Sequence, residues 1–159
     1  MSCVRIVLAS VLTLMLSAMS VRAAGDAEQA NLDILRDTIR ANKKALVAAS
    51  LTLSDQEAAQ FWPLYDKYQA ELTAVNDRAV KVIQDYTSDY KNLSNEKAMQ
   101  LADDWLSAEG DRAKLRRTYL PEFAKVLPGK KVVRFYQIEN KMEAVLRYDL
   151  ASEIPVVEQ

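Results

Sequence analysis

The chain contains no histidine, and Cys3 is its single cysteine among 159 residues. Without histidine, one chain cannot build a Ser-His-Asp or Cys-His nucleophile or a histidine zinc site, and one cysteine excludes a disulfide framework. Three glycines and four prolines are too few for a loop-rich β-protein with many tight turns. We therefore expect no enzyme, no metal site and no cofactor.

The first 23 residues have the pattern of a secretory signal peptide. Arg5 precedes a largely apolar stretch, residues 6–21, and the small residues Ala23 and Ala24 follow it. The alternative is a membrane anchor, but this stretch is shorter than the roughly 20 residues that a spanning helix needs. We expect cleavage after Ala23, a periplasmic protein and no membrane span after processing. Loss of Arg5 and Arg22 lowers the 21 basic residues to 19 against 22 acidic ones, a net charge of −3.

Helical periodicity predicts an all-α fold in residues 24–159, as a single domain of four helices. The first helix is expected at about residues 26–48. Ser54 is a candidate N-cap for the second, with Glu57 three residues later completing a capping box. Pro63 is expected to kink this helix. Its apolar stripe alternates by three and four residues, which is typical of a long helix packed against another: Ala58, Phe61, Tyr65, Tyr68, Leu72, Val75, Ala79, Val82 and Tyr86.

The third and fourth helices follow similar signals. Ser94 is the predicted cap of the third, and Pro121 should bend or end it. Pro128 is well placed at the first position of a fourth helix that runs to about Ala151, and the residues after Pro155 are expected to be loose. The stripe of the third helix is apolar except for one arginine: Ala98, Leu101, Trp105, Ala108, Arg112, Leu115 and Tyr119.

Charge is unevenly distributed along the second half of the chain. Residues 85–111 contain seven acidic side chains opposed by two lysines, whereas residues 112–134 contain eight basic side chains and only Glu122 opposing them. This basic region, mixed with aromatic residues, either attracts negative partners and then holds apolar segments, or pairs with acidic side chains on a neighbouring helix. Under the first interpretation the client- or partner-binding residues are Arg112, Arg116, Arg117, Tyr119, Phe123, Lys130, Lys131, Arg134 and Tyr136.

Two other interpretations of these residues are weaker. Nucleic acid is disfavoured as a partner, because the chain is exported by prediction and its net charge is not basic. Asp103 and Asp104 are adjacent and point about 100° apart on a helix, so they cannot act as paired carboxylates. Three aromatic residues lie off the apolar stripes and are candidates for exposed contacts or a dimer seam: Trp62, Tyr90 and Tyr148.

Two predicted helix starts repeat one another. Residues 53–61 are LSDQEAAQF and residues 93–101 are LSNEKAMQL. These segments resemble the LTxxQ motifs of the Spy/CpxP family of exported envelope-stress proteins. The resemblance implies an antiparallel all-α chain that forms a cradle-like homodimer and holds unfolded or aggregation-prone clients without ATP. Some relatives bind zinc through histidine, which this chain lacks.

The leading hypothesis is therefore an exported ATP-independent chaperone of the holdase type, with unfolded or partly folded envelope proteins as its clients. The alternative is a regulatory protein that binds a membrane-bound envelope-stress sensor or a sigma-factor control system. In the first case the basic region forms a promiscuous surface, and in the second it forms a specific interface.

Overall fold

The computed structural model describes residues 41–157, in which all regular secondary structure is helical. The chain divides into two units, Met1–Leu46 and Val47–Gln159. The second unit contains α2 (Asp55–Asp89), the short 3-10 helix η1 (Tyr90–Asn92), α3 (Asn95–Val126) and α4 (Gly129–Glu153). Residues 41–50 are also helical. The predicted all-α class is confirmed. The predicted signal peptide, its cleavage after Ala23 and most of the first predicted helix lie outside the described residues.

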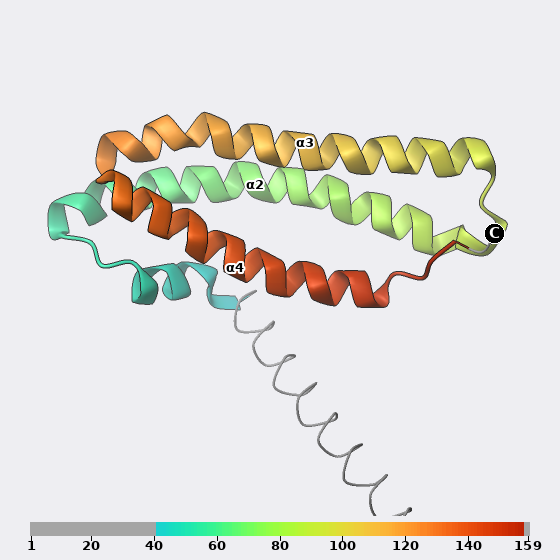
Figure 1. Cartoon of the computed structure of the whole chain (residues 1–159), viewed down its shortest axis with the longest axis horizontal. Helices are drawn as coiled ribbons and strands as arrows, with labels where there is room; N and C mark the ends of the chain where they lie inside the picture. The colour runs from blue at the N-terminus through green and yellow to red at the C-terminus, as the bar shows by residue number, and fades with distance from the viewer. Residues whose placement is uncertain (1–40, 158–159) are drawn as a thin grey trace, which may run out of the picture. The chain divides into compact units, whose positions relative to one another are not determined.

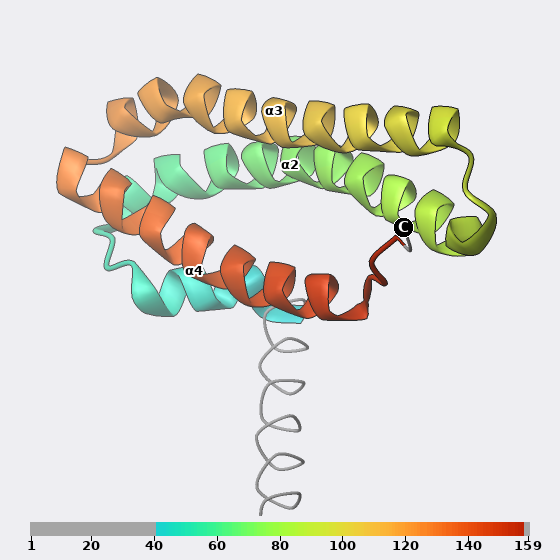
Figure 2. The same ribbon diagram turned by 45° about the vertical axis from the view of Figure 1, so that its right-hand side comes forward.

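Helices α2 and α3 pack side by side as an antiparallel hairpin, as predicted (Figure 1). Two residues, Leu127 and Pro128, separate α3 from α4, and α4 crosses α2 at an angle. In both views α4 lies near α2 at the α3–α4 junction and farther from it at the other end, where the chain turns back toward the end of α2 (Figure 2). The homodimer stays a prediction.

Serine caps begin both helices of the hairpin. The Ser54 hydroxyl oxygen accepts a hydrogen bond from the backbone N–H of Glu57 at 3.3 Å, and the Glu57 carboxylate accepts one from the N–H of Ser54 at 2.7 Å. The predicted capping box is therefore confirmed. Ser94 accepts from the N–H of Lys97 at 3.2 Å. Because the Lys97 side chain has no hydrogen-bond acceptor, it cannot accept a bond from the backbone N–H of Ser94. The start of α3 therefore has only one of the two hydrogen bonds of a capping box.

Neither Pro63 nor Pro121 ends the helix that contains it, and the kink expected at Pro63 stays a prediction. Pro63 and Pro121 both lie inside unbroken helices, and α3 continues past Pro121 to Val126. It ends where Leu127 becomes extended, as expected for a residue that precedes proline. Pro128 is the N-cap of α4 rather than its first helical residue, because its ψ of 143° is extended and helical geometry begins one residue later.

A cluster of aromatic rings forms the core at the end where α2 begins, α3 ends and α4 begins. Phe61, Phe123 and Phe135 are fully buried, and their ring centroids lie 4.6 to 5.7 Å apart. The ring of Trp62 packs edge-on against Phe61 at 5.0 Å and is half-buried, so this tryptophan belongs to the cluster and is not a freely exposed contact residue. Tyr148 is 70% exposed. The aromatic cluster comprises Phe61, Trp62, Tyr65, Tyr68, Tyr119, Phe123, Phe135 and Tyr136.

Candidate functional site

Arg112, which interrupts the apolar stripe of α3, is buried between the helices. Its Nε and Nη2 donate hydrogen bonds to Oδ1 of Asn76 on α2, at 3.1 and 2.9 Å. Its Nη1 pairs with Glu109 on the same helix and lies 3.5 Å from a carboxylate oxygen of Glu143 on α4. Only 8% of the residue is exposed. A buried guanidinium is stable only when its donors are satisfied, and here all three helices supply acceptors.

Two further arginines extend this arrangement into a network. Arg147 on α4 donates to Glu109 at 2.5 Å and to Glu143 at 2.9 Å. Arg116 on α3 also pairs with Glu143. The resulting arginine–glutamate network, Arg112, Arg116 and Arg147 with Glu109 and Glu143, links α3 to α4 midway along the bundle. The basic side chains at positions 112 and 116 are therefore paired internally, as in the second interpretation of the basic region.

The aromatic members of the predicted binding set also have contacts within the fold. Phe123 is fully buried and Tyr119 is 5% exposed, both in the aromatic cluster. The Tyr119 hydroxyl donates to the Glu71 carboxylate at 2.7 Å. Tyr136 is half-buried, and its hydroxyl donates to the backbone carbonyl of Arg116 at 3.0 Å. In this structure Tyr119 and Phe123 do not form a surface that a client could contact.

The remaining basic residues lie near the start of α4. Lys131 donates to the Glu57 carboxylate at 2.6 Å, and this bond, followed by the backbone N–H of Ser54, lowers the pKa of Glu57. Arg134 is exposed but donates through Nε to the backbone carbonyl of Ser50 at 2.8 Å. Arg117 and Lys130 are exposed. Arg117, Lys130 and Arg134 are the members of the predicted set that are exposed to solvent.

Burial changes the titration of the tyrosines in the aromatic cluster. Burial first, and the Glu139 carboxylate second, raise the pKa of Tyr68 to about 12, although the Arg116 guanidinium acts in the opposite direction. The pKa values of Tyr65 and Tyr136 are also raised, in both cases mainly by burial. The folded state therefore holds these protons more tightly than the unfolded chain does.

We expect the folded chain to lose stability in alkali as Tyr68 ionises. The stabilisation that comes from keeping Tyr68 protonated in the folded state is fully present below pH 10, the ordinary pKa of tyrosine. It is lost as the pH rises toward the pKa of about 12 that Tyr68 has in the folded chain. The loss attributable to this residue is roughly 2 kcal/mol. Urea unfolding measured across this range checks it, and Tyr68→Phe should retain more of its neutral-pH stability than the native chain. An equal loss in both proteins would contradict the assignment.

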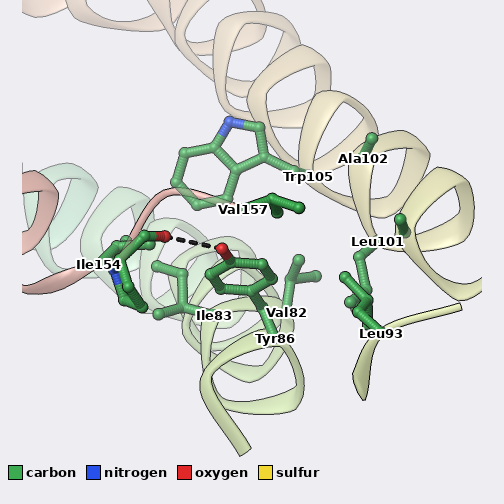
Figure 3. Close-up of a pocket in the computed structure, with 11 residues that line it drawn as sticks. Val82, Ile83, Tyr86, Leu93, Leu101, Ala102, Trp105, Ile154 and Val157 are labelled. Atoms are coloured by element: carbon green, nitrogen blue, oxygen red, sulfur yellow. Dashed lines mark hydrogen bonds between the residues drawn. The ribbon is translucent and has the colours of Figure 1, made fainter. Parts of the chain in front are cut away.

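An open apolar pocket lies at the other end of the bundle, beside the α2–α3 connection. Its volume is about 380 Å³. Figure 3 shows Tyr86 of α2 and Trp105 of α3 facing it, with Val157 of the C-terminal segment between their rings. The lining is almost entirely hydrocarbon and aromatic and consists of Val82, Ile83, Tyr86, Leu93, Ala98, Leu101, Ala102, Trp105, Ile154, Pro155 and Val157.

The pocket and the basic region are separate sites. Trp105 and Arg117 lie twelve residues apart on one helix, which corresponds to about 18 Å along its axis. The acidic part of the sequence, residues 85–111, is the part that supplies much of the pocket. Sequence reasoning placed Tyr86 and Trp105 on packing stripes and missed the pocket, because the stripe does not reveal that α4 diverges before it covers them.

The C-terminal segment contributes to the pocket. Residues 154–157 follow α4 in a non-helical conformation, and the carbonyl oxygen of Pro155 accepts a hydrogen bond from the Tyr86 hydroxyl at 2.7 Å. Val157 lines the pocket and Val156 is 88% exposed, so the expectation that the last residues are loose stays a prediction. An apolar Ile-Pro-Val-Val sequence is the signal that could have indicated this contact.

Within residues 41–157, no helix is long and apolar enough to cross a membrane, and no group of three or more cysteine, aspartate or glutamate side chains is arranged to hold a metal ion. The fold and the pocket define an all-α protein whose long helical hairpin has an aromatic core at one end and an open apolar pocket at the other. Comparison of the chain with protein-family models, curated proteins and solved structures found no match.

Proposed function

We propose that this protein is an exported, ATP-independent holdase that binds apolar segments of unfolded envelope proteins. The observation that carries the proposal is the open pocket of about 380 Å³ between α2, α3 and the C-terminal segment. An open, almost wholly apolar surface favours binding of apolar groups, because their transfer from water is favourable. This mode of binding needs no nucleotide, metal or catalytic group.

The surface around the pocket supports binding of extended chains. Met99 and Leu106 lie on α3 within a few residues of the pocket-lining positions, and they are 71% and 68% exposed. An apolar client segment longer than the pocket could therefore make further contacts along α3. A shallow surface of this kind has no deep anchoring site, so we expect weak and rapidly exchanging binding.

The exposed basic residues have a different role in this proposal. Arg117 and Lys130 lie on the part of the bundle remote from the pocket. We propose that they attract acidic client segments at long range, whereas the pocket holds the apolar ones. Charge reversal at these two exposed positions leaves the arginine–glutamate network and the Lys131–Glu57 pair intact.

Aggregation assays with the chain from residue 24 test the proposal. The native chain should suppress aggregation of a denatured client without nucleotide. Ala102 lines the pocket and is exposed, so Ala102→Glu places a charge at the pocket. This variant should need about tenfold more protein for the same suppression, because burying an unpaired carboxylate beside the client is unfavourable. Ala113→Glu makes the same change at an exposed position of the same helix and is the matched control.

The outcomes separate the two surfaces. Loss of suppression in Ala102→Glu but not in Ala113→Glu supports the pocket. If only the double variant Arg117→Glu/Lys130→Glu loses suppression, and this loss depends on the salt concentration, the client binds to the basic surface instead. No suppression by the native chain at several-fold molar excess would reject the holdase proposal.

A further inference from the structure

The C-terminal segment, residues 154–157, forms one wall of the pocket that the proposed function assigns to clients. Ile154 leaves α4 with an extended backbone, at φ −88° and ψ 116°. Ile154, Pro155 and Val157 line the pocket, whereas Val156 is 88% exposed. An apolar, non-helical segment therefore already lies against α2 and α3, with the Val156 side chain exposed.

The contacts of this segment combine apolar packing with one main-chain hydrogen bond. The Tyr86 hydroxyl donates to the carbonyl oxygen of Pro155 at 2.7 Å, and Figure 3 shows this bond at the edge of the pocket. A hydroxyl that binds a backbone carbonyl recognises any extended chain, because every residue carries that acceptor. The apolar walls select the side chains.

The segment is held only in part. Val157 is 48% exposed although it lines the pocket, and a volume of about 380 Å³ is open with the segment in place. Release of residues 154–157 breaks their packing in the pocket and the hydrogen bond to Tyr86 and leaves the hairpin of α2 and α3 intact, so we expect opening to be a local event. The segment thus has the properties of a weak intramolecular ligand.

We propose that residues 154–157 are an autoinhibitory strap that competes with an extended apolar peptide for this pocket. The inference rests on the proposed function and specifies its ligand: a non-helical apolar segment with a free backbone carbonyl for Tyr86. With the strap in place the open part of the pocket can hold single apolar groups. An extended client segment that takes the strap's own position against α2 and α3 binds only when the strap has left, so its apparent affinity is scaled by the fraction of molecules in which that position is free.

The probe for this proposal is a fluorescent peptide with the sequence of residues 152–159, added in trans. A chain that ends at Glu153 should bind it about three- to tenfold more tightly than the full chain, because a tethered segment competes at a high effective concentration. Fluorescence anisotropy measures the affinity, and circular dichroism verifies that the shortened chain remains folded.

Two point variants keep the test independent of truncation. Val157→Asp removes an apolar side chain of the strap from the pocket and should increase binding of the probe. Val156→Asp introduces the same charge one residue earlier, on a side chain that does not line the pocket, and should leave binding near that of the native chain. Equal affinities for the native, shortened and Val157→Asp chains would overturn the proposal.

Other results distinguish the strap from the holdase function and from a second copy. If the full chain suppresses client aggregation and Ala102→Glu does not, but removal of the strap has no effect on probe affinity, the strap is wrong and the holdase stands. If removal increases probe affinity but no variant suppresses aggregation, the strap stands and the holdase fails. If the full chain is a dimer that truncation converts to monomers, the segment fills a second copy's pocket, which overturns the intramolecular strap.

Discussion

Arg112→Ala is expected to lower the free energy of unfolding by about 3 kcal/mol, because it leaves partly buried groups without their partner. Asn76 loses two hydrogen bonds, and Glu109 and Glu143 lose a cation. The loss stays moderate because Arg147 contacts both carboxylates and they are partly exposed. Urea unfolding of the chain from residue 24, followed by circular dichroism, measures the change.

Arg117→Ala is the matched control for this substitution. Arg117 lies on the same helix but is exposed, so its removal should change stability by less than about 0.5 kcal/mol. The double variant Arg112→Ala/Glu143→Ala should be more stable than the sum of the single effects implies, since the second change removes a carboxylate that the first left unpaired. Equal effects of Arg112→Ala and Arg117→Ala would mean that the network does not stabilise the bundle.

Phe123→Ala is expected to lower the free energy of unfolding by about 4 kcal/mol, the range found when a large buried aromatic side chain is removed. Phe123 is fully buried, and its ring lies 4.6 Å from that of Phe135 and 5.7 Å from that of Phe61. It joins α2, α3 and α4 at one point, so the cavity left by its removal weakens contacts among all three. Thermal and urea unfolding both measure this loss.

The comparison with an exposed neighbour separates a core role from a binding role. Leu120→Ala, on the same helix at a side chain that is 48% exposed, should destabilise by less than about 1 kcal/mol. The sequence alone placed Phe123 in a client-binding set. If Phe123→Ala leaves stability unchanged and reduces client binding, that earlier interpretation is correct and the core assignment is wrong.

The fold was largely predictable because its signals are local. The spacing of apolar residues and the Ser54 cap with Glu57 depend only on neighbours along the chain, and the structure contains both as expected. The positions of prolines were less informative. Pro63 and Pro121 disfavour a helix locally, but packing of the flanking Phe61 and Phe123 in the core favours its continuation.

The site was less predictable because its geometry depends on distant residues. The basic region near Arg112 and Arg116 has clear chemistry in the sequence, but its carboxylate partner Glu143 lies 27 residues beyond Arg116 on another helix. The pocket depends on where α4 diverges from α2 and on where the last residues return, and neither follows from periodicity. A stripe position such as Trp105 looks the same in sequence whether a third helix covers it or not.

The two ends of the bundle contain one tryptophan each, and these are the only two in the chain. Trp62 lies in the aromatic cluster, and Trp105 lines the pocket. The end with densely packed rings should open only in global unfolding, whereas the end with the pocket opens in smaller local fluctuations. The Trp62→Phe chain retains Trp105, so its fluorescence follows the end with the pocket, whereas the Trp105→Phe chain retains Trp62 and follows the aromatic cluster. Amide hydrogen exchange should be faster near Tyr86 than near Tyr65.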